Sequence, residues 1–117
     1  PEDTDWREIA ALYALLLRHE PTPVVELNRA AAVAMAQGPE VGLRLIDDIV
    51  SRGDLTDFHV LYASRGDLLK RLGRREEAAA AYRTALSLAT VDAEKRFLAW
   101  RIAELTDSKN KNGPSVG

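Results

Sequence analysis

The residues best suited to acid–base or metal chemistry are two histidines, His19 and His59. Neither has a histidine or a carboxylate four residues away, the spacing that places two metal ligands on one helix face. The candidate nucleophiles Ser51, Ser64 and Ser87 lie outside any nucleophile-elbow pattern. The sequence therefore predicts no catalytic residue and no metal site. The enzymatic alternative, a small hydrolase that pairs His59 with a carboxylate, requires a closed pocket around that histidine.

Asp47 and Asp48 are adjacent carboxylates, which raises the question of an acid–base dyad. Neighbouring residues in a helix point about 100° apart, so these side chains do not converge on one reacting atom. Arg44 and Arg52 lie three to five residues from them along the chain. We therefore expect either a solvated helix face or a salt bridge to one of these arginines, instead of a dyad.

The composition of the chain limits which structural elements could position any such residue and which classes of function are possible. The 117-residue chain carries a net charge of −2 and has no cysteine. This charge gives no global attraction to nucleic acid or to an anionic membrane, and the lack of cysteine excludes disulfides, cysteine-ligated zinc and thiol catalysis. No apolar run approaches the ~18–20 residues that span a bilayer, and the acidic N-terminal stretch does not resemble a signal peptide. We expect no cofactor, no membrane contact and a cytoplasmic location.

The sequence predicts an all-α fold, because alanine and leucine together make 34 of the 117 residues and both favour helices. Apolar residues recur at helical spacing between Pro, Gly and capping residues, which divides the chain into six helices. The first begins near Thr4 or Asp5 and ends before Pro21, and the others cover about 23–37, 39–52, 58–71, 75–89 and 92–105. We treat residues 1–105 as one helical domain and 106–117 as a flexible polar tail.

The predicted helices repeat in pairs. Gly38 and Gly73, each between a first and a second helix, lie 35 residues apart. A helix–turn–helix unit of this period is typical of the tetratricopeptide repeat (TPR). Residues 58–91 resemble that motif at its aromatic, glycine and small positions: Tyr62, Gly66, Gly73, Ala78, Tyr82 and Ala85. The resemblance implies antiparallel hairpins that form a short right-handed solenoid.

Other parts of the chain match the TPR motif less well. In residues 58–91, Thr90 replaces the closing proline, and in residues 23–55, Ala31 stands where the motif has glycine. Residues 4–21 resemble only the second helix of a repeat. We therefore expect the sequence to be a fragment of a longer protein.

A more specific resemblance runs across about residues 3–105. Its ordered motifs are Asp5-Trp6, Leu12-Tyr13, Pro23-Val24-Val25, Leu27-Asn28-Arg29-Ala30, Gly38-Pro39, Gly42-Leu43, Arg65-Gly66-Asp67-Leu68-Leu69, Arg71-Leu72-Gly73-Arg74 and Arg96-Phe97-Leu98. This series is similar to the C-terminal TPR-like extension of a group of bacterial extracytoplasmic-function (ECF) RNA polymerase sigma factors.

The sigma-factor resemblance implies a non-catalytic regulatory domain that acts in transcription initiation. Its partners would be the other domains of the same sigma factor, RNA polymerase, or both, and DNA would be contacted only by N-terminal domains absent from this sequence. A second copy of the fragment is a further partner to consider, because an apolar patch left near Trp6 would invite dimerisation. The alternative is a stand-alone TPR-type adaptor that binds a peptide or protein in its concave groove.

If TPR geometry holds, residues from two helices face that groove. We predict the candidate interaction residues to be Val25, Asn28 and Met35, with Asp67, Lys70 and Arg71. Two alternatives remain open at this point. Asn28 could instead bond a neighbouring helix, as buried polar groups do, and the basic residues around 70–75 could be a solvated turn near a helix C-terminus.

Overall fold

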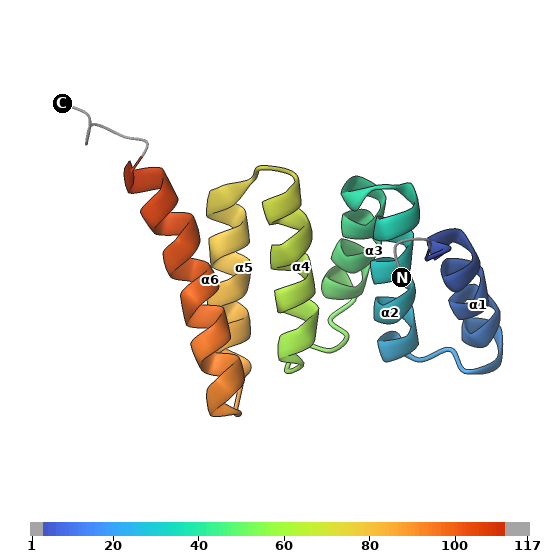
Figure 1. The fold of residues 1–117 in the computed structure, drawn as a ribbon. Helices are drawn as coiled ribbons and strands as arrows, with labels where there is room; N and C mark the ends of the chain where they lie inside the picture. Colours follow the sequence, from blue (N-terminus) through green and yellow to red (C-terminus); the bar gives the residue numbers. More distant parts are fainter. Residues whose placement is uncertain (1–3, 112–117) are drawn as a thin grey trace. The chain divides into compact units, whose positions relative to one another are not determined.

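The structure is a computed structural model that describes the backbone of residues 4–111 and the side chains of residues 4–106. Within this range it is entirely helical and has no strand, which confirms the predicted all-α class (Figure 1). Its six helices are α1 (Trp6–His19), α2 (Pro23–Gln37), α3 (Pro39–Ser51), α4 (His59–Arg71), α5 (Arg75–Leu88) and α6 (Asp92–Lys111).

The first two helices begin at residues whose side chains cap them. Asp5 accepts a hydrogen bond from the backbone N–H of Glu8 at 3.1 Å, and Thr22 accepts one from the N–H of Val25 at 3.2 Å. Each bond satisfies a donor that the first turn of a helix leaves unpaired. Pro23 follows Thr22 at the first helical position, where its missing N–H costs nothing.

The chain divides into two units by its internal contacts, residues 1–56 and residues 57–117. In the first unit α2 packs against α1 and α3, and in the second unit α5 packs against α4 and α6. The short turns at Gly38 and Gly73, both at positive φ, join the helices of each hairpin. The largest fully buried side chains are Ile46 and Ile49 in the first unit and Leu61, Leu69 and Tyr82 in the second.

Close approach at a glycine fixes the α2–α3 contact. A Cβ on Gly42 of α3 would lie 2.5 Å from the Cβ of Ala34 and 2.9 Å from the carbonyl oxygen of Ala30. Both contacted residues are buried on α2. The missing side chain at Gly42 therefore lets the two helix backbones pack closely.

In the α4–α5 contact a glycine lies against an aromatic ring instead of an alanine. A Cβ on Gly66 of α4 would lie 2.8 Å from two ring carbons of Tyr82 on α5. Tyr82 is completely buried, so its ring fills the space that Gly66 leaves open.

The sixth helix is longer than predicted. It continues from Leu105 to Lys111, through residues that the sequence assigned to a flexible tail. The Thr106 hydroxyl donates to the carbonyl of Ile102 at 2.9 Å, a bond compatible with helix. Polar residues alone do not end a helix, and no glycine or proline occurs between Leu105 and Gly113. The remaining tail residues, 112–117, lie outside the described part of the chain.

Candidate protein-interaction groove

An open groove of about 390 Å³ lies on the second unit between side chains of α4 and α6. Both helices pack on α5 (Figure 1). Most of the lining is apolar, and Val60 and Phe97 stay 38% and 51% exposed. The lining residues are His59, Val60, Ala63, Ser64, Asp67, Ala93, Glu94, Phe97 and Leu98. We call this surface the α4–α6 groove.

Two ion pairs join α4 to α6. The Nε2 of His59 lies 3.1 Å from a carboxylate oxygen of Glu94, and the Nζ of Lys70 lies 3.7 Å from a carboxylate oxygen of Glu104. The first pair joins the N-terminal turns of the two helices, and the second lies 10 to 11 residues further along them. The two helices therefore run in the same direction, with residues 34 to 35 apart in sequence placed side by side.

Asp67 links the lining of the groove to α5. Its carboxylate accepts a short hydrogen bond from the hydroxyl of Tyr82. Burial, together with this bond and the Asp67 charge, raises the pKa of Tyr82 well above the usual range for tyrosine. The phenol therefore stays protonated and donates to Asp67 at neutral pH.

Beside the groove, α6 exposes two aromatic rings. Phe97 and Trp100 have ring centroids 6.3 Å apart, and Trp100 is 56% exposed. The guanidinium carbon of Arg101 lies 5.0 Å from the Phe97 centroid and 5.9 Å from the Trp100 centroid, within cation–π range. Tryptophan and arginine are among the residue types that dominate binding energy at protein interfaces.

Three of the predicted interaction residues lie in the first unit. Val25 is only 9% exposed, so its side chain belongs to the buried part of α2 and not to an open groove. Asn28 is exposed, so it does not serve as a buried link between helices. Met35 is 48% exposed and lines a shallow pocket with Trp6 at the start of α1.

The other three predicted residues lie in the second unit, on α4. Asp67 lines the α4–α6 groove, where it bonds Tyr82. Lys70 is half-buried and engaged with Glu104, and Arg71 is exposed at the end of α4. Of these three, Asp67 lines the groove, whereas neither Lys70 nor Arg71 is among its lining residues.

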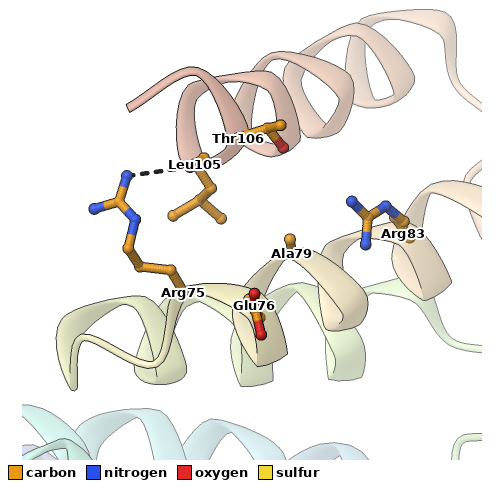
Figure 2. A pocket seen from close by; sticks show the side chains of 6 residues that line it. All are labelled: Arg75, Glu76, Ala79, Arg83, Leu105 and Thr106. Carbon is orange, nitrogen blue, oxygen red and sulfur yellow. Dashed lines mark hydrogen bonds between the residues drawn. The ribbon is translucent and has the colours of Figure 1, made fainter. Parts of the chain in front are cut away.

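The basic residues at the α4–α5 turn make contacts within the second unit. Arg74 donates two hydrogen bonds to Glu77, at 2.7 and 2.8 Å, which lower the pKa of that carboxyl group. Arg75 donates to the carbonyl of Leu105 at 3.1 Å across a small pocket of about 290 Å³ between α5 and α6 (Figure 2). These contacts favour a turn near a helix C-terminus over an interaction site for these basic residues.

On the first unit, the predicted salt bridge within α3 is confirmed. Arg52 lies 3.1 Å from Asp48, four residues before it. The same guanidinium also reaches Glu26 on α2 at 2.6 Å and Asp54 at 3.2 Å, two contacts that the sequence did not suggest. These carboxylates raise the pKa of Arg52 above its usual value, so the cluster ties α3 to α2.

Sequence reasoning missed the main groove residues on α6. The apolar residues of this helix differ in burial, because Leu98 and Leu105 are buried and Phe97 is exposed. A signal was present, because Phe97 follows Tyr62 and Ala63 by 34 to 35 residues, the repeat period. In a repeat, positions one period apart on successive first helices share a surface.

Two searches for other kinds of site gave negative results within the described residues. Residues 4–106 contain no group of three histidine or acidic side chains arranged to hold a metal ion. None of the helices between residues 4 and 111 combines the length and the hydropathy that a bilayer crossing requires.

Comparison with known proteins gives one informative relative. The chain is 42% identical over 105 residues to an uncharacterized protein of Rhizobium meliloti (strain 1021). The match covers 90% of this chain and 24% of the relative, so the chain spans about a quarter of that protein. No family model matches the chain, and no solved structure does.

Proposed function

We propose that the chain is a non-catalytic, protein-binding regulatory domain of an ECF-type RNA polymerase sigma factor, acting in bacterial transcription initiation. The observation that carries the binding role is the α4–α6 groove, which is apolar, open and edged by the exposed Phe97. The sigma-factor assignment rests on the ordered sequence motifs across residues 3–105. Its partner is a segment of the other sigma domains or of RNA polymerase in the bacterial cytoplasm.

We further propose that the helices form TPR-like repeats. The ion pairs His59–Glu94 and Lys70–Glu104 support this, because each joins residues 34 or 35 apart, the period read from the sequence. That register makes α6 the first helix of the next repeat after α4 and α5. Gly66 against Tyr82 supplies the close contact that the motif requires within a hairpin.

The groove has the composition of a docking surface for an apolar peptide segment or helix. Exposed apolar side chains contribute binding energy when a partner removes them from water, and Val60 and Phe97 both line the groove. The ion pairs and the Tyr82–Asp67 bond hold its walls in place before binding, which reduces the entropy lost on association.

The proposal is tested by co-purification with the isolated N-terminal sigma regions and with core polymerase. Phe97→Asp places a charge in the groove and should weaken capture about tenfold or more. Val91→Asp is the matched control, since Val91 is 53% exposed just before α6 but does not line the groove. Equal capture of both variants and of the unchanged chain would refute the role of the groove.

The alternative is a stand-alone adaptor that uses the same groove for a peptide. The two hypotheses differ in what the gene encodes before Pro1 and in which protein is captured. A sigma-type helical region encoded directly upstream, together with capture of sigma regions or polymerase, supports the regulatory domain. Groove-dependent capture of another protein, without either of these, supports the adaptor.

A further inference from the structure

The outward face of α1 carries leucines at the spacing of a helix-pairing seam. Leu12, Leu15 and Leu16 are 60%, 51% and 39% exposed. Leu12 and Leu15 form a series with Glu8 and His19. Its intervals are four, three and four residues, the pattern of the paired faces in coiled coils. We call this surface, made of Glu8, Leu12, Leu15, Leu16 and His19, the α1 seam.

The α1 seam is not needed by the core of the first unit. The opposite face of α1 packs on α2 through Ala10, with Ile9 and Tyr13 beside it. Ala10 is buried, whereas the seam leucines are among the most exposed large apolar residues of the described chain. Apolar side chains gathered on one face at this spacing indicate a surface that another helix covers.

Charge along the seam selects an antiparallel partner with the same sequence. Glu8 lies near the N-terminal end and His19, next to Arg18, near the C-terminal end. Both the carboxylate of Glu8 and the imidazole of His19 belong to exposed residues. An antiparallel copy would place each of these two groups opposite the other, whereas a parallel copy would place like groups together.

The apolar residues agree with the same register. The midpoint between Leu12 and Leu15 along the helix is also the midpoint between Glu8 and His19. It falls between Tyr13 and Ala14. A two-fold axis at that centre sets Leu12 against Leu15 of the partner subunit and Glu8 against His19 of the partner subunit. A single register therefore satisfies the apolar and the charged positions together.

We propose that a second copy of this chain docks antiparallel on the α1 seam, forming a two-fold dimer through the first unit. The seam is only about three turns long, so this dimer belongs to the small, concentration-dependent class of interfaces. The α4–α6 groove lies on the other unit and takes no part in the pairing. This inference is therefore independent of the function proposed above.

Sedimentation equilibrium over a range of protein concentrations tests the dimer. The average mass should rise from 12.9 kDa toward twice that value as the concentration increases. The double variant Leu12→Gln and Leu15→Gln should remain at 12.9 kDa, whereas the control Val24→Gln, which changes a 43% exposed residue on α2, should behave like the unchanged chain. Helical circular dichroism and thermal melts confirm that each variant is folded.

Cysteine cross-linking tests the register, because the chain has no cysteine of its own. A mixture of Glu8→Cys and His19→Cys proteins should form a disulfide-linked pair much faster than either protein alone. Faster linkage within each separate protein would mean parallel pairing and would overturn the antiparallel register. A chain that stays monomeric at every concentration, or that dimerises equally well without Leu12 and Leu15, would overturn the proposal altogether.

Discussion

At the scale of single residues, the bond between Tyr82 and Asp67 connects the core of the second unit to its surface. The ring of Tyr82 is buried against Gly66, and its hydroxyl reaches a carboxylate that lines the α4–α6 groove. Asp67 was predicted as a residue that contacts a partner. In the structure it first satisfies a buried hydroxyl, so one side chain serves both the fold and the shape of the groove.

We predict that Asp67→Ala destabilises the chain more than Tyr82→Phe does. Removing the acceptor leaves a buried hydroxyl unpaired, at a cost of ~1–3 kcal/mol, whereas removing the hydroxyl leaves only a carboxylate that water can reach, at ~0.5–1.5 kcal/mol. Urea unfolding of both variants and of the double variant measures the difference. A larger loss for Tyr82→Phe would mean that the bond does not satisfy the hydroxyl.

The raised pKa of Tyr82 predicts a loss of stability at alkaline pH. In the unfolded chain this phenol ionises with the ordinary tyrosine pKa near 10, whereas in the folded chain it ionises only at higher pH. Folding is therefore favoured in full below pH 10, and the free energy of unfolding falls as the pH rises above that value. Urea unfolding between pH 8 and pH 11 should show this fall in the unchanged chain and a smaller one in Tyr82→Phe.

At the scale of elements, each hairpin depends on a close helix contact. Gly42 against Ala34 makes this contact in the α2–α3 hairpin, and Gly66 against Tyr82 makes it in the α4–α5 hairpin. Alanine is a better helix former than glycine by ~1 kcal/mol, so a glycine at these positions is explained by packing.

Gly66→Ala should destabilise the protein despite the gain in helix propensity. The new Cβ would lie 2.8 Å from the ring of Tyr82, which is buried and has no free space to move into. Overpacking of this kind costs ~1–3 kcal/mol. A lower melting temperature is the expected result, and a higher one would contradict the tight contact.

A pair of alanines on α5 provides a matched test of the same idea. Ala85 is fully buried and Ala80 is exposed on the same helix. Ala85→Leu should destabilise by ~1–3 kcal/mol through overpacking, whereas Ala80→Leu should change stability by less than ~0.5 kcal/mol. Chemical denaturation of both proteins checks the contrast, and equal effects would show that the hairpin tolerates added volume.

At the scale of the whole molecule, the helices could be predicted from the sequence because their ends carry local signals. Asp5, Thr22 and Gly38 act at the helix boundaries through bonds or φ angles that involve only neighbouring residues. The start of the fourth helix is less well marked, because Phe58 holds the capping position without a side-chain bond.

The direction in which each helix faces was harder to predict, because it depends on which helices pack against it. Leu12, Leu16 and Phe97 fit the helical spacing of a core face, yet all three are exposed. On α6, Leu98 and Leu105 occupy the core and turn Phe97 outward. An apolar pattern identifies a helix face that another surface covers. Only the packing shows whether the covering surface belongs to the same unit.

The division of the chain also depends on packing that the sequence does not display. We expected one helical domain over residues 1–105, whereas contacts gather within residues 1–56 and within residues 57–117. The proposed surfaces follow this division, with the α1 seam on the first unit and the α4–α6 groove on the second. Each can therefore be altered without changing the residues of the other.

The most direct test of the docking role is amide NMR of the chain titrated with the isolated sigma regions and, separately, with core polymerase. The account predicts that one of these partners changes the signals of residues 59–67 and 93–98, which contain the groove lining. Phe97→Asp should abolish the change and Val91→Asp should preserve it. Signals that stay unchanged with both partners, or that change only within residues 4–56, would contradict docking in the groove.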